Sequence, residues 1–433
     1  MTHSDYSERL RRVIPGGAHT YSRGDDQYPS NAPRILARGQ GVHVFDPAGS
    51  AFLDYGMALR AVNIGYAEPE VAAAAIQQIE NGNNLTRPSL IELEAAELLT
   101  DLIDSVDMVK FTKNGSTSVT AAVKLARAYT GRDLIARCAE HAFFSYDDWF
   151  IGSTPVTRGI PYDTIEKTQL FHYNDIASLE ALVSRYPGEL ACVVLEPEVT
   201  EAPRDEFLRK VQDLCRAHGI VFVLDEMITG FRWHPKGAQH VYGVTPDLCT
   251  FGKAMANGFS VSCVAGRREL MELGAIEPEG AERVFLLSTT HGAEMSGLGA
   301  FVATVRFMQE HDVVGHLWDY GRRLIGVMQG LADAHGIAGS FKIGGSPCSP
   351  YYVTLDGTGA SSLALRTLFN QELIRAGVLM PWIALAYRHG DAELAATERA
   401  VDRAFAVYRK ALNDGVGKYL EGPAIKPVFR KYN

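Results

Sequence analysis

The middle of the chain alternates fully apolar runs with single amphipathic helices, and this pattern constrains the fold more than any other feature. Residues 192–195 and 220–224 are unbroken apolar runs. Between them, residues 204–218 carry apolar side chains at helical spacing, and Gly219 follows as a helix stop. Buried strands joined by one helix are typical of a parallel sheet with helices on its faces. The sequence therefore predicts an α/β fold with a central, mostly parallel sheet.

The chain is long enough for more than one domain, since it has 433 residues. Past about residue 300 the alternation gives way to a mainly helical pattern with some strands. We expect an N-terminal segment over residues 1–60, a large domain over residues 61–310 and a smaller α+β domain over residues 311–433. The N-terminal segment is expected to pack with the C-terminal domain.

The composition is that of an ordinary globular protein. The net charge is −9, and Lys and Arg do not cluster into a basic stripe. No apolar run reaches membrane-spanning length, and the first residues lack the apolar core of a signal peptide. The six cysteines form no Cys-x-x-Cys pair, which is typical of buried thiols in a reducing compartment. We therefore expect a cytoplasmic protein with no metal, no nucleic acid and no membrane among its partners.

Two of the predicted strands end in acidic residues. Glu196 directly follows the run 192–195, and Asp225 and Glu226 follow the run 220–224. Because open α/β sheets bind ligands at the carboxyl ends of their strands, acids on consecutive strands indicate a shared cleft. The alternative is that such an acid caps the following turn.

A small polar loop opens another predicted helix, over residues 117–130. The loop contains Gly115, Ser116 and Thr117 and follows a short apolar run. Backbone N–H groups at the start of a helix suit a phosphate group. Capping of the helix by Ser116 or Thr117 is the alternative, and for this motif alone it is favoured.

Lys253 follows a short apolar stretch and Gly252, and small residues come after it. A lysine recessed in this way can act as an amine nucleophile, although a surface lysine is the simpler interpretation of this motif alone. The three motifs together match pyridoxal 5'-phosphate (PLP). Its phosphate needs N–H donors, its pyridine nitrogen needs a carboxylate, and its aldehyde needs a lysine amine.

A longer stretch around these motifs resembles a known enzyme family. Residues 221–232 read Val-Phe-Val-Leu-Asp-Glu-Met-Ile-Thr-Gly-Phe-Arg, and residues 246–253 read Pro-Asp-Leu-Cys-Thr-Phe-Gly-Lys. In these motifs the chain resembles class III aminotransferases of the fold-type-I PLP enzymes, nearest the glutamate-1-semialdehyde aminomutase subgroup. The resemblance runs from about residue 10 to residue 410. It implies a large PLP-binding domain with a smaller α+β domain built from both ends of the chain.

The resemblance implies a role for each motif. Lys253 would form a Schiff base with PLP and move the substrate proton, and Asp225 would pair with the pyridinium nitrogen. Further cofactor contacts would come from Gly115, Ser116, Thr117, Glu196, Met227 and Thr290. The family threonine matching Thr290 reaches the PLP phosphate of the neighbouring subunit, which implies a homodimer with shared active sites. The phosphate loop is scrambled relative to the family's Ser-Gly-Thr order.

The residue that stacks on the PLP ring is ambiguous. The family has Tyr-His-Gly at this place, whereas residues 141–149 read His-Ala-Phe-Phe-Ser-Tyr-Asp-Asp-Trp. With one inserted residue Phe143 takes the stacking position. His141 is the second candidate for stacking, and we also expect it to bind substrate. Core packing of Phe143 or Phe144 is the alternative.

Two arginines are candidates for binding an acidic substrate. Arg23 lies in a segment, residues 15–23, that resembles the aminomutase segment whose arginine contacts the substrate carboxylate. Arg60 falls where aminomutases have small residues beside a tryptophan. Either guanidinium could pair with a carboxylate, and the alternative for each is a surface or structural arginine.

The function predicted is amino transfer in two half-reactions, from an amino-acid donor to PLP, giving PMP, and then to a carbonyl acceptor. Glutamate is the first candidate for the donor. An intramolecular aminomutase of the glutamate-1-semialdehyde type is the alternative, and a racemase or epimerase is a third PLP option. A noncatalytic binding protein on the same fold is the alternative from another class, which the presence of both Lys253 and Asp225 disfavours.

Overall fold

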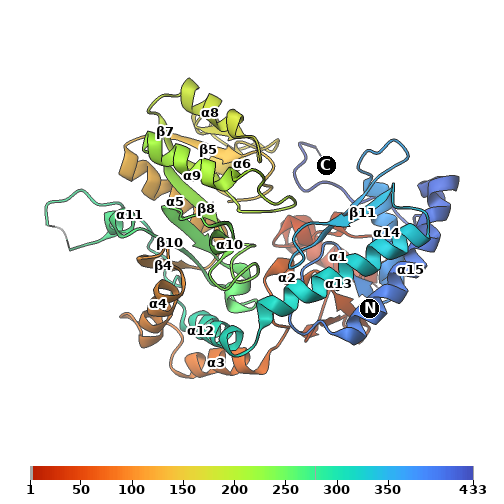
Figure 1. Cartoon of the computed structure of the whole chain (residues 1–433). Coiled ribbons are helices and arrows are strands. Elements are labelled where there is room, and N and C mark those ends of the chain that lie inside the picture. Colours follow the sequence, from red (N-terminus) through yellow and green to blue (C-terminus); the bar gives the residue numbers. More distant parts are fainter. Residues whose placement is uncertain (1–2, 278, 433) are drawn as a thin grey trace. The chain divides into compact units, whose positions relative to one another are not determined.

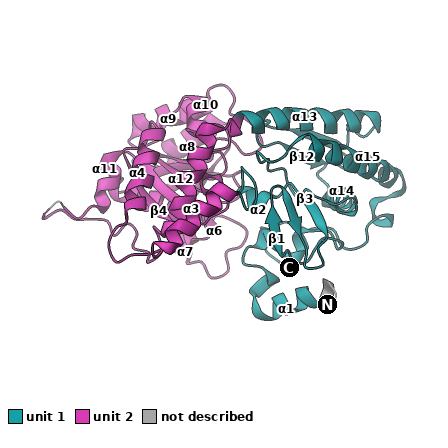
Figure 2. Ribbon diagram, turned by 90° about the horizontal axis from the view of Figure 1, so that it is seen from below, with its two compact units in different colours: residues 1–68, 315–433 teal, residues 69–314 magenta. Residues whose placement is uncertain are grey.

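The computed structural model describes residues 3–277 and 279–432 (Figure 1). The chain divides into two compact units (Figure 2). The first combines both ends of the chain, residues 1–68 and 315–433, and the second is the continuous middle, residues 69–314.

The second unit is built on a seven-stranded sheet of order β4-β10-β9-β8-β7-β5-β6. Its strands are β4 (Met108–Thr112), β5 (Leu134–Cys138), β6 (Thr168–Phe171), β7 (Leu190–Leu195), β8 (Val221–Asp225), β9 (Leu248–Phe251) and β10 (Ser262–Gly266). The pairs β5–β6, β5–β7, β7–β8 and β8–β9 are parallel, and β10 runs antiparallel to both of its neighbours. The predicted α/β fold with a mostly parallel sheet is therefore confirmed.

Helices cover this sheet because they bury apolar side chains against its strands. Every residue of β7 is buried, as expected of a strand enclosed on both faces. Helices α8 (Ile176–Arg185) and α9 (Phe207–His218) share an apolar cluster with β5, β7 and β8, and α5 (Gly115–Thr130) packs on the strands as well. Helices α5 and α9 end at Gly131 and Gly219, both left-handed, as the sequence predicts for glycine stops.

The second unit contains further helices outside these layers. They are α3 (Pro69–Glu80), α4 (Leu90–Leu102), α6 (Asp148–Ile151), α7 (Tyr162–Glu166), α10 (Ala238–Tyr242), α11 (Arg268–Met271) and α12 (Met295–Glu310). Short 3-10 turns lie at Lys253–Ala256 and Glu272–Gly274.

The first unit has a four-stranded sheet of order β1-β2-β3-β13. Its strands are β1 (Arg38–Gln40), β2 (His43–Phe45), β3 (Ala51–Asp54) and β13 (Val378–Leu379), and a separate hairpin pairs β11 (Phe341–Gly344) with β12 (Tyr351–Thr354). The helices are α1 (His3–Val13), α2 (Met57–Arg60), α13 (Val313–Ala334), α14 (Leu363–Arg375) and α15 (Asp391–Asp414). Single 3-10 turns lie at Pro15–Gly17, Tyr21–Arg23, Asp25–Gln27 and Val416–Lys418.

Within the part of the chain that the structure describes, no helix is both long and apolar enough to cross a membrane. All six cysteines are buried free thiols.

Candidate active site

The carboxyl end of β8 carries the first site residue, Asp225. Its side chain is 2% exposed, and its Oδ1 accepts hydrogen bonds from the Met227 N–H at 2.9 Å and the Thr250 hydroxyl at 3.0 Å. Burial raises the pKa of Asp225 to about 6, while the positive charge of Lys253 opposes this rise. The carboxyl group is therefore held in a fixed orientation within the electrostatic reach of Lys253.

Lys253 begins a 3-10 turn that follows the neighbouring strand β9, with Gly252 between them. In the register of the sheet Asp225 pairs with Thr250, three residues before Lys253. Lys253 itself has a left-handed backbone, with φ 44°, and is partly buried. A left-handed residue that is not glycine is uncommon and is often found at functional sites.

The polar loop lies at the start of α5, as predicted, but its cap is a different residue. Asn114 is the N-cap, and its Oδ1 accepts bonds from the Thr117 N–H at 2.9 Å and the Thr117 hydroxyl at 3.0 Å. Capping by Ser116 or Thr117 is therefore wrong, because the helix begins at Gly115 and both residues already lie in its first turn. Ser116 instead accepts a bond from the Tyr146 N–H through its hydroxyl, at 3.2 Å.

The side chain of Met227 brings the three predicted motifs together. A Cβ atom on Gly115 would lie 2.8 Å from Met227 Sδ, and one on Gly252 would lie 2.6 Å from the same sulfur. Both distances are shorter than real contacts of a Cβ atom, so a side chain at either position would have to displace Met227, and at Gly252 also the Ser262 hydroxyl, which lies 2.5 Å from that point. The start of α5, the end of β8 and the residue before Lys253 therefore meet around one thioether.

Glu226, next to Asp225, binds backbone N–H groups at the start of α10. It is fully buried and accepts bonds from the Ala238 N–H at 2.9 Å, the Gln239 N–H at 2.8 Å and the Thr229 hydroxyl. Burial raises its pKa. Glu226 therefore binds the first N–H groups of α10, whereas the turn that directly follows β8 is bound by Asp225, through the Met227 N–H. The Asp225 carboxyl binds no such helix start.

Glu196 and His141 form a second buried contact in this unit. The backbone N–H of Glu196 donates to His141 Nδ1 at 2.9 Å, so the proton of the neutral ring lies on Nε2. Burial lowers the pKa of His141 to about 3. The ring packs near Phe144 and Tyr173, with centroid distances of 6.0 Å and 5.1 Å. These contacts fix the position of His141 and keep it uncharged at neutral pH.

Phe143 and Phe144 differ sharply in exposure. Phe144 is 2% exposed, which matches core packing, whereas Phe143 is 49% exposed. The Phe143 ring makes an edge contact with Phe150 at a centroid distance of 5.7 Å. Of the two phenylalanines, Phe143 is the one whose ring is accessible to a ligand.

Thr290 lies in an exposed loop whose position depends on residues that the sequence did not single out. The Asn84 amide donates to the Thr290 carbonyl at 3.0 Å. Asn83 donates to Glu294 at 2.9 Å, and Lys113 pairs with the same carboxylate at 2.6 Å. The loop after α3 therefore holds the Thr290 segment in place.

The two predicted substrate arginines lie in the first unit. Arg23 ends a short 3-10 turn and is exposed, and its charge lowers the pKa values of Tyr28 and Tyr66 against the larger rise caused by burial. Arg60 is partly buried and ends the short element α2.

The backbone of α2 is left-handed throughout. Its φ values are 38° at Met57, 49° at Ala58, 62° at Leu59 and 68° at Arg60, the longest run of positive φ in the described chain. A left-handed helical conformation costs an L-residue with a side chain roughly 1–2 kcal/mol. This turn therefore needs compensating interactions.

Asp54 and Tyr66 supply these interactions, and sequence reasoning missed both. The buried Asp54 carboxylate accepts bonds from the Gly56 N–H at 2.7 Å, the Met57 N–H at 3.2 Å and the Tyr66 hydroxyl at 2.6 Å. The Tyr66 oxygen in turn accepts a bond from the Ala58 N–H at 2.7 Å. Hydrogen bonds to a charged group each contribute about 1.5–3 kcal/mol, enough to offset the strain of such residues.

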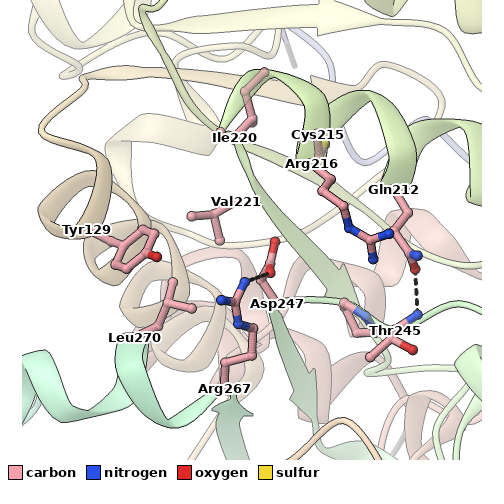
Figure 3. A pocket seen from close by; sticks show the side chains of 12 residues that line it. Tyr129, Gln212, Cys215, Arg216, Ile220, Val221, Thr245, Asp247, Arg267 and Leu270 are labelled. Atoms are coloured by element: carbon pink, nitrogen blue, oxygen red, sulfur yellow. Dashed lines mark hydrogen bonds and ion pairs between the residues drawn. The ribbon is translucent and has the colours of Figure 1, made fainter.

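A cavity of about 480 Å³ lies elsewhere in the second unit, at the amino end of β8 (Figure 3). Its lining includes Val221, the first residue of that strand, and none of the predicted site residues. Some of its polar groups pair with one another: Arg267 with Asp247, and Gln212 with the Thr245 N–H at 2.6 Å. Ligands of open α/β sheets bind at the opposite, carboxyl ends of the strands.

The residues at the carboxyl end of β8 fit PLP. The first-turn N–H groups of α5 can bind a phosphate, the Asp225 carboxyl can bind a pyridine nitrogen, and Lys253 carries the amine. The two glycines, Gly115 and Gly252, place backbone rather than side chains beside Met227.

Comparison with known proteins also indicates an enzyme that uses PLP. The family described as aminotransferase class-III matches residues 25–340. A relative, 3-aminobutyryl-CoA aminotransferase of Cloacimonas acidaminovorans (strain Evry), is 31% identical over 94% of this chain and 97% of its own length.

Solved structures of similar proteins cover nearly the whole chain. The FumI protein of Sphingopyxis sp. MTA144, solved with PLP, is 27% identical with a TM-score of 0.86 over 95% of this chain and 97% of its own. An omega-transaminase from Sphaerobacter thermophilus is 27% identical with a TM-score of 0.82, over 94% and 98%. A glutamate-1-semialdehyde-aminomutase from Pseudomonas aeruginosa PAO1, 20% identical with a TM-score of 0.82 over 95% and 94%, shares the fold. The chain therefore belongs to the class III aminotransferase family, and it is a PLP-dependent enzyme of amino transfer.

Proposed function

We propose that Lys253 binds PLP covalently through Nζ and that Asp225 pairs with the pyridine nitrogen. The observation that carries this proposal is the convergence on Met227, whose sulfur contacts the positions of both Gly115 and Gly252. Met227 would lie against one face of the PLP ring.

The phosphate would be bound by the first turn of α5. The Gly115 and Ser116 N–H groups are the principal donors in this proposal, since such first-turn groups lack an acceptor within a helix. Thr117 would contribute less, because both its N–H and its hydroxyl bind Asn114. Phe143 would stack on the ring, as its exposure allows. Glu196 and His141 would line the site through their shared buried contact.

When bound, PLP supplies an electron-withdrawing ring that lowers the cost of removing a proton from the amine-bearing carbon of a substrate. Lys253 Nζ would accept that proton from the carbon and return it in the reverse direction. Asp225 would hold the proton on the pyridine nitrogen. Its buried position strengthens this pairing, because charges interact more strongly where water is excluded.

We propose an amino acid as donor, with glutamate the first candidate, and a 3-oxo acid or its derivative as acceptor. The support is the name of the relative, which acts on 3-aminobutyryl-CoA. Because the reaction is reversible, the 3-amino counterpart of the acceptor should also serve as a donor. Arg23 and Arg60 would bind a substrate carboxylate by guanidinium–carboxylate pairing.

We propose a homodimer in which Thr290 binds the PLP phosphate of the partner subunit. Thr290 is exposed on the single chain, and the same unit exposes large apolar side chains that a partner could cover, including Leu85, Leu90 and Phe285. Mixing Lys253→Ala with Thr290→Ala protein should then form hybrid dimers with one restored site. Hybrids without activity would contradict the shared site. The six buried free thiols support a cytoplasmic location.

The reaction type is tested with the purified PLP-bound enzyme. Its visible absorbance should fall when an amino donor is added alone and return when a carbonyl acceptor follows, with the amine recovered in the acceptor. An aminomutase would instead isomerise one substrate without an acceptor. A protein whose absorbance responds to no donor in a broad screen would contradict amino transfer.

A further inference from the structure

The loop that carries Phe143 is attached to the first turns of α5 by hydroxyl groups. Ser145 is fully buried, and its Oγ lies 3.0 Å from Thr120 Oγ1 and donates to the Ser116 carbonyl at 3.4 Å. The Tyr146 N–H donates to the Ser116 hydroxyl at 3.2 Å. Two consecutive loop residues are therefore joined to Ser116, which lies in the turn of α5 proposed to bind the phosphate.

The hydrogen bonds between the hydroxyl groups run in one direction. Ser145 has a single hydroxyl proton and donates it to the Ser116 carbonyl, so the Thr120 hydroxyl is the donor to Ser145. Thr120 Oγ1 in turn accepts the indole N–H of Trp149 at 2.9 Å. The chain of bonds thus passes from α6, which contains Trp149, to the start of α5. We call Thr120 and Ser145 the hydroxyl link.

Exposure along the loop indicates what the hydroxyl link holds. Phe144 and Ser145 are 2% and 0% exposed, whereas Phe143, directly before them, is 49% exposed. The Phe144 and Phe143 rings both make edge contacts with Phe150, at centroid distances of 5.8 Å and 5.7 Å. A large aromatic ring is therefore exposed on a backbone that two buried neighbours fix in place.

The hydroxyl link reaches the candidate active site within the second unit. Ser116 directly follows Gly115, whose Cβ position lies 2.8 Å from Met227 Sδ. The Met227 N–H in turn donates to Asp225 at 2.9 Å. The link therefore joins the loop of Phe143 to the same turn of α5 that meets Met227.

We propose that Thr120 and Ser145 are positioning residues that hold the loop of Phe143 on the phosphate-binding turn of α5. Occupation of this turn by a phosphate then orders the residue that stacks on the PLP ring, so the two ends of the cofactor are recognised together. This inference rests on the proposed function, in which α5 binds the phosphate and Phe143 stacks on the ring. The hydroxyl link itself does not contact PLP in this account.

A purely structural role of the hydroxyl link makes a different prediction. If the link only fastened α6 to α5, its loss would lower stability, and any loss of PLP affinity would be the same with or without the Phe143 ring. If the link positions Phe143, replacing that residue with alanine should remove most of the effect, because the coupled partner is then absent.

The test uses three variants of the hydroxyl link in the full-length protein: Thr120→Val, Thr120→Ser and Ser145→Ala. Thr120→Val keeps the shape of the side chain and removes the hydroxyl, whereas Thr120→Ser keeps the hydroxyl. Thr130→Val is the matched control, because Thr130 is also partly buried in α5 and its hydroxyl donates to the Ala126 carbonyl at 2.8 Å, away from the loop. Thr120→Val and Ser145→Ala are each also combined with Phe143→Ala.

Two measurements are made on the cofactor-free proteins, and neither needs turnover. Hydrogen–deuterium exchange over residues 141–147 is recorded with and without inorganic phosphate, which tests whether the turn of α5 orders the loop. Titration with PLP gives the dissociation constant of each single and double variant. Ser145→Ala breaks the link at its second member, so it decides the question independently of Thr120→Val.

In the wild type and in Thr120→Ser, phosphate should slow exchange over residues 141–147. In Thr120→Val and Ser145→Ala, exchange should be faster and the effect of phosphate smaller. Each of these two changes should weaken PLP binding about fivefold, as for the loss of one neutral hydrogen bond. The loss should be less than about twofold when Phe143 is already alanine. Thr130→Val should match the wild type in both measurements.

Two outcomes would overturn the inference alone: wild-type exchange in both Thr120→Val and Ser145→Ala, or losses of PLP affinity that are equal with and without the Phe143 ring. A Phe143→Ala protein that binds PLP as tightly as the wild type would instead remove the stacking role from the proposed function, and the positioning role would fall with it. Exchange in the wild type that does not respond to phosphate would overturn the coupling between the phosphate-binding turn and the loop.

Discussion

The sulfur of Met227 lies 2.6 Å from the point that a Cβ atom of Gly252 would occupy. This contact joins the residue after the β8 acids to the residue before the reactive lysine. Since Gly252 has an extended backbone, with φ −179°, alanine there would be opposed by its contacts with Met227 and with the Ser262 hydroxyl, 2.5 Å away, and not by its conformation.

We expect Gly252→Ala to displace Lys253 or Met227. Overpacking of a filled site costs typically 1–3 kcal/mol, so both the thermal midpoint and the bound PLP per chain should fall. Gly326→Ala is the matched control, because a Cβ atom there meets no neighbour within 4 Å and lies within α13, where alanine is the better helix former. A Gly252→Ala enzyme with full PLP content and unchanged stability would contradict the contact.

The pKa of Asp225 makes the cofactor-free protein sensitive to pH. Folding raises this pKa from 3.8 to about 6, so the protonated form is favoured in the folded state. The resulting stabilisation is complete below the unfolded pKa and is lost as pH rises through about 6. Asp225→Asn cannot titrate. Relative to the free energy of unfolding of the Asp225→Asn protein, that of the wild type should fall by roughly 3 kcal/mol between about pH 4 and 7.

Urea unfolding of the two cofactor-free proteins measures this difference, and a constant offset across the pH range would contradict it. With PLP added, the comparison should favour the wild-type protein over Asp225→Asn. Asp225→Asn should bind PLP more weakly and react far more slowly, because the pyridine nitrogen loses its charged partner.

His141 should remain neutral throughout the working range of the enzyme. Burial lowers its pKa to about 3, and its Nδ1 is occupied by the Glu196 N–H. Imidazole NMR signals of His141 should therefore show the Nε2–H tautomer and no titration between about pH 5 and 8. A titration step in that range would mean that the ring is solvated or paired with a charge.

Phe143 and Phe144 provide a comparison between adjacent residues. Phe144→Ala should destabilise the protein by about 3–5 kcal/mol, because it empties a core position. Phe143→Ala should leave stability nearly unchanged and weaken PLP binding, since its exposed ring is the stacking candidate. Thermal unfolding and PLP titration separate the two effects. Equal destabilisation with unaltered PLP affinity would remove Phe143 from the site.

Local patterns predicted those parts of the fold and site that depend on neighbours in sequence. The apolar runs gave β7 and β8, and the acids after them lie at the strand ends. The local pattern alone did not distinguish Asp225 from Glu226, and the family resemblance singled out Asp225. Glu226 instead binds the start of α10, twelve residues later. Likewise, Asn84 binds Thr290 across 206 residues of sequence.

The left-handed turn Met57–Arg60 could not be predicted because its local sequence favours another conformation. Met57 to Arg60 would be read as a right-handed helical turn, and the bonds from Asp54 and Tyr66 override that preference. Such a conflict between local preference and tertiary structure is expected mainly at functional or strained sites.

The covalent attachment of PLP is the central claim, and borohydride reduction followed by peptide mapping tests it most directly. Reduction fixes the cofactor to the amine that holds it, and Lys253→Ala protein serves as the control without that amine. The account predicts one pyridoxyl label per chain, on Lys253, and no label in the control. A label on a different lysine, or wild-type protein without a label, would contradict it.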